Sequence, residues 1–219
     1  MSGFSFRGQD QVDDCATCHG NQKPKSINDN VLLPKKFSMK WKMYEYRSSS
    51  RPPITRLPVD TKFIDGVTHY DWDRRAMTEI YHERCIDIFS AGRDFSCQFL
   101  SKKNKTYFIK NLGEEKESCC RWSAGDFWAP RPDVLSTMKF DEHSNLRGRD
   151  VFWSWLDIGL PGPFGYGLFN ASKEPAAFWF PVIGGLVQQE FYHFRTSDID
   201  RDLFSLPLSC KSNISICVR

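Results

Sequence analysis

Hydrophobic and polar residues alternate along much of the chain, and this pattern predicts β-strands. The clearest example is the stretch KKFSMKWKM, in which Phe37, Met39, Trp41 and Met43 share one face and three lysines and a serine occupy the other. Strict alternation of this kind is typical of a half-buried strand. Further short candidate strands, separated by turn-type clusters, cover residues 62–73, 76–89, 95–101, 105–112, 151–160, 164–171, 176–184 and 186–196. Their spacing predicts an antiparallel meander.

Several of these strands carry apolar side chains on both faces, so each face of the sheet has to be covered. A curved antiparallel sheet can provide this cover by folding around its own apolar concavity, which can hold one small apolar ligand. We therefore expect a mainly β fold of curved antiparallel sheets. The residues expected to line a ligand pocket in the concavity are Phe37, Met39, Trp41, Trp153, Trp155, Phe178 and Phe180.

The chain divides into a polar arm and one domain. Residues 1–35 are rich in Asn, Asp, Gln, Lys and Ser and predict an irregular arm, whereas residues 36–219 predict a single antiparallel β domain with a cysteine-containing tail. Residues 121–142 predict an aromatic cover segment in which Asp133 caps a short helix over VLSTM. The glycine-rich stretch 159–167 predicts a turn, because it lacks the Lys-Ser/Thr of a phosphate-binding loop.

Composition and charge narrow the class of protein. Aromatic residues make up 15% of the 219 residues, which favours strands, and the formal net charge of only +3 argues against a nucleic-acid partner. The chain contains no run of eighteen apolar residues, so we expect a soluble protein that does not span a membrane. The first residues lack the apolar stretch of a secretory signal, which leaves open whether one was removed.

Cysteines and glycosylation sequons indicate an oxidising compartment. Eight cysteines form an even set along the chain, and three Asn-x-Ser/Thr triplets accompany them. Together they predict a secreted or organelle-lumen protein that is stabilised by disulfides and glycosylated. The expected disulfide cysteines are Cys15, Cys18, Cys85, Cys97, Cys119, Cys120, Cys210 and Cys217, and the expected glycosylation sites are Asn104, Asn170 and Asn213. Cys119 and Cys120 are expected to take two separate partners, because neighbouring cysteines do not easily reach disulfide geometry.

The arm contains the sequence Cys15-Ala-Thr-Cys18-His19, which has three interpretations. Its spacing matches the attachment site of a c-type haem, although no apolar residue nearby would shield a porphyrin. A zinc site would need further ligands, which Cys119 and Cys120 could supply. We favour disulfides, either a local 15–18 bridge or two bridges that tie the arm to the domain, with His19 a solvated bystander. In the second case, replacing both arm cysteines by serine would lower thermal stability markedly.

Candidate catalytic residues are weakly supported. His69 precedes Asp71 and Asp73, and His82 precedes Glu83, so each group could serve acid–base chemistry. Asp and Glu are ordinarily solvated at strand edges, which is the interpretation we favour. No serine or cysteine nucleophile lies in a recognisable motif such as Gly-x-Ser-x-Gly. We therefore expect no catalysis.

The order of several short motifs resembles the ependymin-related proteins. These motifs are YDWDRR, ERCIDIF, YFI, FWAPRPDVL, a Gly-Arg that leads into a tryptophan-rich strand, and the closing DIDRDLFSLPLSC. The similarity spans about Phe37 to Cys210, and its best match is the closing stretch with Asp200, Phe204, Pro207 and Cys210. Cys85 and Cys119 or Cys120 are also similar in position to family cysteines.

The resemblance implies a secreted or lysosomal glycoprotein, linked by disulfides and often dimeric. It also implies a deeply curved antiparallel half-barrel, similar to bacterial lipoprotein carriers, with a lipid-like ligand in the hydrophobic concavity. Calcium binding is implied at the family level, but no calcium ligand carries over residue by residue. The arm and the adjacent cysteines depart from the family pattern.

Three functions follow as expectations. The leading one is a non-enzymatic module that binds a hydrophobic, lipid-like ligand and carries no resident cofactor or metal. The second is a structural or assembly subunit of the same fold, whose concavity is filled by its own aromatic side chains or by a partner chain. The third is an electron carrier that holds c-type haem through Cys15, Cys18 and His19.

Overall fold

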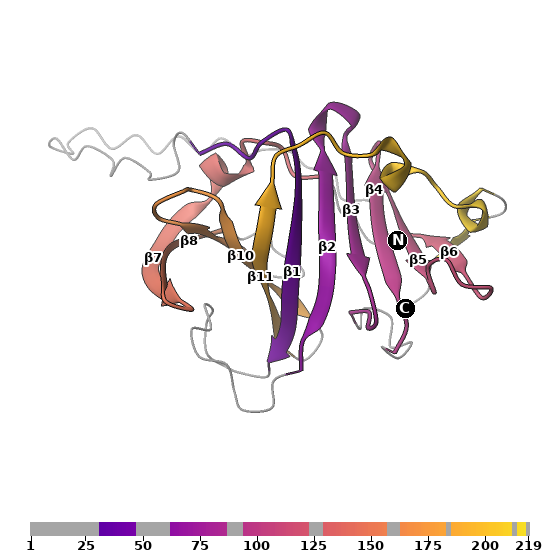
Figure 1. The fold of residues 1–219 in the computed structure, drawn as a ribbon, viewed down its shortest axis with the longest axis horizontal. Coiled ribbons are helices and arrows are strands. Elements are labelled where there is room, and N and C mark those ends of the chain that lie inside the picture. The colour runs from indigo at the N-terminus through magenta and orange to yellow at the C-terminus, as the bar shows by residue number, and fades with distance from the viewer. Residues whose placement is uncertain are drawn as a thin grey trace, which may run out of the picture.

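In the described part of the chain, the centre of the fold is one curved sheet of twelve strands (Figure 1). The computed structural model describes residues 31–46, 62–86, 94–122, 129–156, 163–182, 185–211 and 214–217. The strands are β1 Lys36–Tyr46, β2 Ile64–Asp71, β3 Ala76–Tyr81, β4 Cys97–Lys102, β5 Lys105–Lys110, β6 Ser118–Arg121, β7 Lys139–Leu146, β8 Arg149–Leu156, β9 Phe164–Phe169, β10 Pro175–Val182, β11 Gly185–Arg195 and β12 Ser215–Ile216. Four short 3-10 helices accompany them in this part of the chain: η1 Trp72–Arg74, η2 Val134–Thr137, η3 Arg201–Phe204 and η4 Leu208–Cys210.

The sheet consists of two meanders that meet at β1. Its strand order is β12-β6-β5-β4-β3-β2-β1-β11-β10-β9-β8-β7. Within β1–β6, and again within β7–β11, strands that follow one another in sequence lie side by side. The two meanders join where β1 pairs antiparallel with β11, for example Trp41 with Phe191. Every pairing is antiparallel except that of β12 with β6. The expected mainly β fold with a curved antiparallel half-barrel is confirmed.

One face of the sheet, here called the inner face, carries the largest apolar cluster. Cross-strand pairs place Phe37 of β1 beside Tyr70 of β2, and their rings stack with centroids 4.6 Å apart. The cluster takes buried side chains from β1–β5, β8, β9 and β11, and Phe178 and Phe180 of β10 pack against it. Side chains from strands far apart in the sheet therefore meet over the inner face, which is the consequence of strong curvature.

A cover segment, residues 129–138, closes part of the inner face. It contains η2, and its side chains Ala129, Leu135 and Met138 belong to the inner cluster. The Tyr70 hydroxyl donates a hydrogen bond to the Pro130 carbonyl at 2.6 Å, and the Leu33 amide donates to the Pro132 carbonyl at 2.8 Å. One hydrogen bond to β2, one to the segment before β1 and three buried side chains thus hold the cover in place.

The opposite face, here called the outer face, is covered at β3–β5 by the C-terminal strap, residues 199–210. Ile199, Phe204 and Cys210 of the strap form a buried cluster with residues of β3, β4 and β5. The Lys102 ammonium also donates a hydrogen bond to the Phe204 carbonyl at 2.8 Å. Figure 1 shows the strap in yellow running past the ends of β2 and β3 towards β4.

Three local expectations need correction. Two predictions overlap at residues 164–167, a turn over 159–167 and a strand over 164–171; the strand is confirmed as β9, because Gly165 and Gly167 leave the space that tryptophan rings of the neighbouring strands occupy. Asp133 precedes η2, but its side chain makes no cap; it instead pairs with Arg131 at 2.7 Å. Strands β6 and β7 were not expected, since their sequences SCCR and KFDEHSNL are short or polar.

Candidate functional site

The candidate site is a small cavity against the inner face of β3, β4 and β5. Its volume is about 40 Å³, and its lining residues are Met77, Glu79, Tyr81, Ile86, Phe99, Ser101, Thr106 and Phe180. A space of this size admits a few water molecules and is far smaller than a typical ligand pocket. The inner side chains themselves fill most of the concavity.

Alternation along β3 builds one wall of the cavity. Met77, Glu79 and Tyr81 point to the inner face, whereas Ala76 packs on the outer face beneath the C-terminal strap. Glu79 lies opposite Phe99 of β4 in the register. A carboxyl group is therefore placed in the middle of an apolar and aromatic row.

Burial dominates the electrostatics of Glu79. Desolvation raises the pKa of its carboxyl group to about 7, and a hydrogen bond from the Tyr81 hydroxyl, at 3.4 Å, acts weakly in the other direction. The same burial raises the pKa of Tyr81 well above its ordinary value, and the nearby Glu79 adds to this effect. At neutral pH the cavity thus contains a carboxyl group poised between its neutral and charged forms.

Beside the cavity, Trp41 forms the floor of the inner face. Its indole ring lies over Gly66, its cross-strand partner on β2, where any Cβ atom would collide with the ring. The indole N–H donates a hydrogen bond to the Thr68 hydroxyl at 3.0 Å, and Tyr81 meets the ring edge-on with centroids 4.8 Å apart. The ring is fully buried and held by contacts on several sides.

The predicted pocket residues divide between the two faces. Phe37, Met39 and Trp41 belong to the inner cluster, and Phe178 and Phe180 pack against it. Of these five, only Phe180 lines the cavity. The expectation for the remaining two residues is corrected, because Trp153 and Trp155 belong to a separate cluster on the outer face. Phe152 is the residue of β8 that enters the inner cluster.

Sequence reasoning missed the β3 residues of the cavity. The available signal was the spacing of Met77, Glu79 and Tyr81 at every second position, which places all three on one face of a strand. Glu79 interrupts an otherwise apolar row, and a charged residue in such a row is ordinarily assigned to solvent.

Six of the eight expected disulfide cysteines are confirmed as disulfides. The pairs are Cys85–Cys97, Cys119–Cys210 and Cys120–Cys217. The adjacent cysteines of β6 thus take two separate partners, as predicted. Three disulfides suggest an oxidising compartment.

This pairing corrects two interpretations of the arm. Cys119 and Cys120 cannot supply thiolates to a zinc site, because both are already in disulfides. All six cysteines outside the arm pair among themselves, so no thiol remains for a bridge from the arm to the domain. Cys15, Cys18 and His19 lie outside the described residues. Within the described ranges, no group of three or more His, Cys, Asp or Glu could hold a metal ion.

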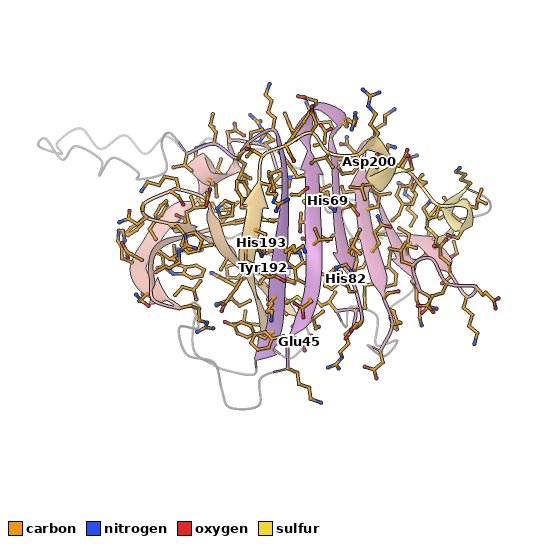
Figure 2. All side chains as sticks on the ribbon, viewed as in Figure 1. Glu45, His69, His82, Tyr192, His193 and Asp200 are labelled. Atoms are coloured by element: carbon orange, nitrogen blue, oxygen red, sulfur yellow. A yellow bond between two sulfur atoms is a disulfide. The ribbon has the colours of Figure 1, made fainter. Side chains whose placement is uncertain are left out.

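The candidate acid–base residues do not converge on the cavity. The ring of His69, on β2, lies 2.7 Å from the Ser38 hydroxyl through Nδ1, and burial lowers its pKa. Asp71 is buried and paired with Arg74 at 3.0 Å, whereas His82 and Glu83 are exposed after β3. Figure 2 shows His69 and His82 well apart along the sheet.

Two of the three sequon asparagines can be placed. Asn104 lies exposed in the turn between β4 and β5, and Asn170 lies exposed after β9. The Asn170 side chain donates a hydrogen bond to Asp150 at 2.8 Å. Asn213 lies outside the described residues, and glycosylation itself stays a prediction.

Comparison with known proteins gives distant likenesses of fold. No protein-family model matches this sequence, and no curated protein matches it. Among solved structures, the chain is similar to an uncharacterized conserved protein from Thermus thermophilus, with a TM-score of 0.49, 6% identity, and coverage of 88% of this chain and 95% of that one. A LolA superfamily protein from Nitrosomonas europaea gives a TM-score of 0.38 at 7% identity, covering 82% and 94%.

The lipoprotein LppX from Mycobacterium tuberculosis gives a TM-score of 0.37 at 8% identity, covering 74% of this chain and 89% of that one. Within the described ranges, no helix is long and apolar enough to cross a membrane.

Proposed function

We propose that the protein binds a hydrophobic, lipid-like ligand between the inner face of the sheet and its cover, without catalysing a reaction. The observation that carries this proposal is the continuous apolar and aromatic lining of the inner face, to which eight strands contribute buried side chains and β10 adds half-buried rings. A sheet that needed only a core could fill this space with aliphatic residues. Here the half-buried rings of Phe164, Tyr166, Phe178 and Phe180 remain at its border.

Binding requires the inner face to open, because a cavity of about 40 Å³ cannot hold an acyl chain. The cover segment is the element suited to move. Its described hydrogen bonds to the rest of the chain are few, and η2 is a single 3-10 turn that adds little rigidity of its own. Displacing Leu135 and Met138 would expose apolar surface that a ligand chain could then cover.

The proposal includes a cellular setting. Three disulfides and two exposed sequons support secretion or residence in an organelle lumen. Membership in the ependymin-related family rests on the closing motif with Phe204 and Cys210. The dimer and the calcium binding which that family implies, like haem at Cys15, Cys18 and His19, stay predictions.

A second function is favoured by the size of the cavity. An inner face filled by its own side chains suits a structural or assembly subunit that carries no ligand. Such a protein would run as a stable oligomer in gel filtration and would release no lipid.

Extraction of native material tests the leading proposal. Protein secreted from eukaryotic cells and extracted with organic solvent should yield a lipid in stoichiometric amount by mass spectrometry. Recombinant protein should also bind diphenylhexatriene, a neutral apolar fluorophore. Met77→Trp, which fills the cavity, should abolish that binding, whereas Lys105→Trp on an exposed position should retain it.

Far-ultraviolet circular dichroism would confirm that both variants are folded. If folded wild-type protein releases no lipid and binds no fluorophore, the ligand-binding proposal is wrong and the structural alternative takes its place.

A further inference from the structure

Glu79 is the feature of the cavity that a simple apolar site does not explain. We infer that the cavity selects amphiphiles with a cationic head group, a long-chain amine rather than a fatty acid, and that the Glu79 carboxylate receives that head. This inference rests on the proposed function and deepens it by naming the class of ligand.

The surroundings of Glu79 contain no compensating cation among the described residues. Its described polar contact is the long hydrogen bond from Tyr81, on the same strand. Of the other elements, β2 contributes Tyr70 and β9 contributes Tyr166, whose pKa is raised by burial and by the nearby Glu79. The remaining lining comes from Met77, Ile86, Phe99, Ser101, Thr106 and Phe180, none of which carries a charge.

A carboxylate in such a place is costly unless something pairs with it. Removing an ion from water without a partner carries a large penalty, which is why the pKa of Glu79 rises to about 7. A ligand ammonium group placed beside the carboxylate would supply the missing charge and form a charge-assisted hydrogen bond. An ionised fatty acid would instead place a second negative charge beside the first.

The position of Glu79 also suits a head-group contact. Phe99, its cross-strand neighbour, lines the same cavity, and Phe180 reaches it from β10. The carboxyl group is thus surrounded on its own face by the apolar surface that would receive the ligand chain. Head and chain would be recognised at one place, as in sites where a few polar groups orient an apolar ligand.

The selectivity should depend on pH in a definite direction. Above the pKa of Glu79 the carboxylate is charged and the amine is favoured. Below it the carboxyl is neutral and an amine loses most of its advantage over an alcohol. An alkylamine itself, like a lysine side chain, stays protonated up to about pH 10. The titration of the site therefore belongs to the protein group, since Tyr70, Tyr81 and Tyr166 stay protonated throughout this range.

Chain-matched competitors test the inference. Dodecylamine, dodecanol and dodecanoate, each below its micellar concentration, would displace bound diphenylhexatriene at about pH 8.5 and about pH 5.5. At the higher pH, wild-type protein should bind the amine about tenfold more tightly than the alcohol, as expected for one charge-assisted contact, and dodecanoate most weakly. At the lower pH the preference for the amine over the alcohol should largely disappear.

Two variants locate the effect. Glu79→Gln keeps the size of the side chain and should bind amine and alcohol equally at both pH values. Glu174→Gln, which removes an exposed carboxylate beyond β9, should behave as wild type. If wild type shows no preference for the amine at the higher pH, or if Glu79→Gln retains it, the inference is overturned while ligand binding stands. If no competitor displaces the fluorophore, both the inference and the proposed function fail.

Discussion

At the scale of single residues, contacts between tryptophan and glycine shape both faces of the sheet. Three strand glycines lie directly opposite a tryptophan on the neighbouring strand, and a Cβ atom on any of them would collide with the indole ring. The missing side chain of the glycine thus leaves room for the tryptophan ring to lie flat on the sheet. The pairs are Gly66 with Trp41 on the inner face, and Gly165 with Trp179 and Gly167 with Trp153 on the outer face.

Replacing Gly66 by alanine should destabilise the protein by about 2–3 kcal/mol, because the Trp41 ring cannot move without disturbing the inner cluster. Gly113→Ala is the matched control, since that glycine has open space around it and carries only the cost of its φ of +75°. We expect the control to lose about 1 kcal/mol. Urea denaturation measures both, and equal losses would contradict the packing argument.

The raised pKa of Glu79 makes stability depend on pH. Because the folded-state pKa of about 7 exceeds the unfolded value of about 4.5, the folded protein retains this proton more strongly. The resulting stabilisation is fully present below pH 4.5 and is lost as the pH rises through 7. Glu79→Gln should therefore match wild type near pH 4.5 and exceed it by about 1–2 kcal/mol near pH 8, an amount reduced for the partial exposure of the side chain.

Denaturation at several pH values measures this difference, with Glu174→Gln as the control that should follow wild type throughout. A stability gap between wild type and Glu79→Gln that is the same at every pH would show that Glu79 does not titrate as proposed.

At the scale of elements, two segments outside the sheet are attached to it in different ways. The cover segment rests on the inner face through hydrogen bonds and side-chain packing. The C-terminal region is attached covalently, through Cys119–Cys210 and Cys120–Cys217. One element can thus separate from the sheet at modest cost, and the other cannot.

Tyr70→Phe should loosen the cover, because it removes the hydroxyl that donates to the Pro130 carbonyl and keeps the stacked ring. We expect a loss of about 1 kcal/mol in stability. Amide exchange in residues 129–138 should become faster, and diphenylhexatriene should bind more rapidly. Tyr107→Phe, on the outer face, is the control and should leave both rates unchanged. Unchanged exchange in Tyr70→Phe would mean that the hydrogen bond does not hold the cover.

The two C-terminal disulfides should behave as a redundant pair. They close sequence separations of 91 and 97 residues from adjacent cysteines, so once either exists the other closes a loop of only about eight residues. In the chain-entropy model, removing one pair with serine costs about 2.5 kcal/mol, and removing both costs about 7 kcal/mol. Thermal denaturation of the three variants measures this, and losses that simply add would contradict a shared loop.

At the scale of the whole molecule, local patterns predicted strands well and long-range arrangement poorly. The alternation at Phe37 to Met43 correctly predicted a strand, because a period of two is a property of neighbouring residues. Trp153 and Trp155 were assigned to the wrong face. Strand β8 is apolar on both sides, so its register with β9, and not its own sequence, decides which side chains point to the inner face. The pairing of β1 with β11, between opposite ends of the chain, has no local signal at all.

The two arm cysteines should contribute little to the stability of the domain. Since no domain thiol is free to bridge it, the Cys15→Ser, Cys18→Ser double variant should unfold within about 0.5 kcal/mol of wild type. This reverses the expectation drawn from the sequence. Differential scanning calorimetry measures it, and a large loss of stability would show that Cys15 and Cys18 stabilise the domain in another way.

The seam between the two meanders has a consequence for how the chain is made. Strand β1, Lys36–Tyr46, leaves the ribosome long before its partner β11, Gly185–Arg195, because most of the other strands lie between them in the sequence. Until then one edge of β1 offers unpaired amides and carbonyls beside an apolar row, which is the kind of surface that chaperones protect and that aggregation exploits. Closure of the sheet is thus delayed until β11 has been made, and yield in cells should depend more on chaperone capacity than on the stability of the finished sheet.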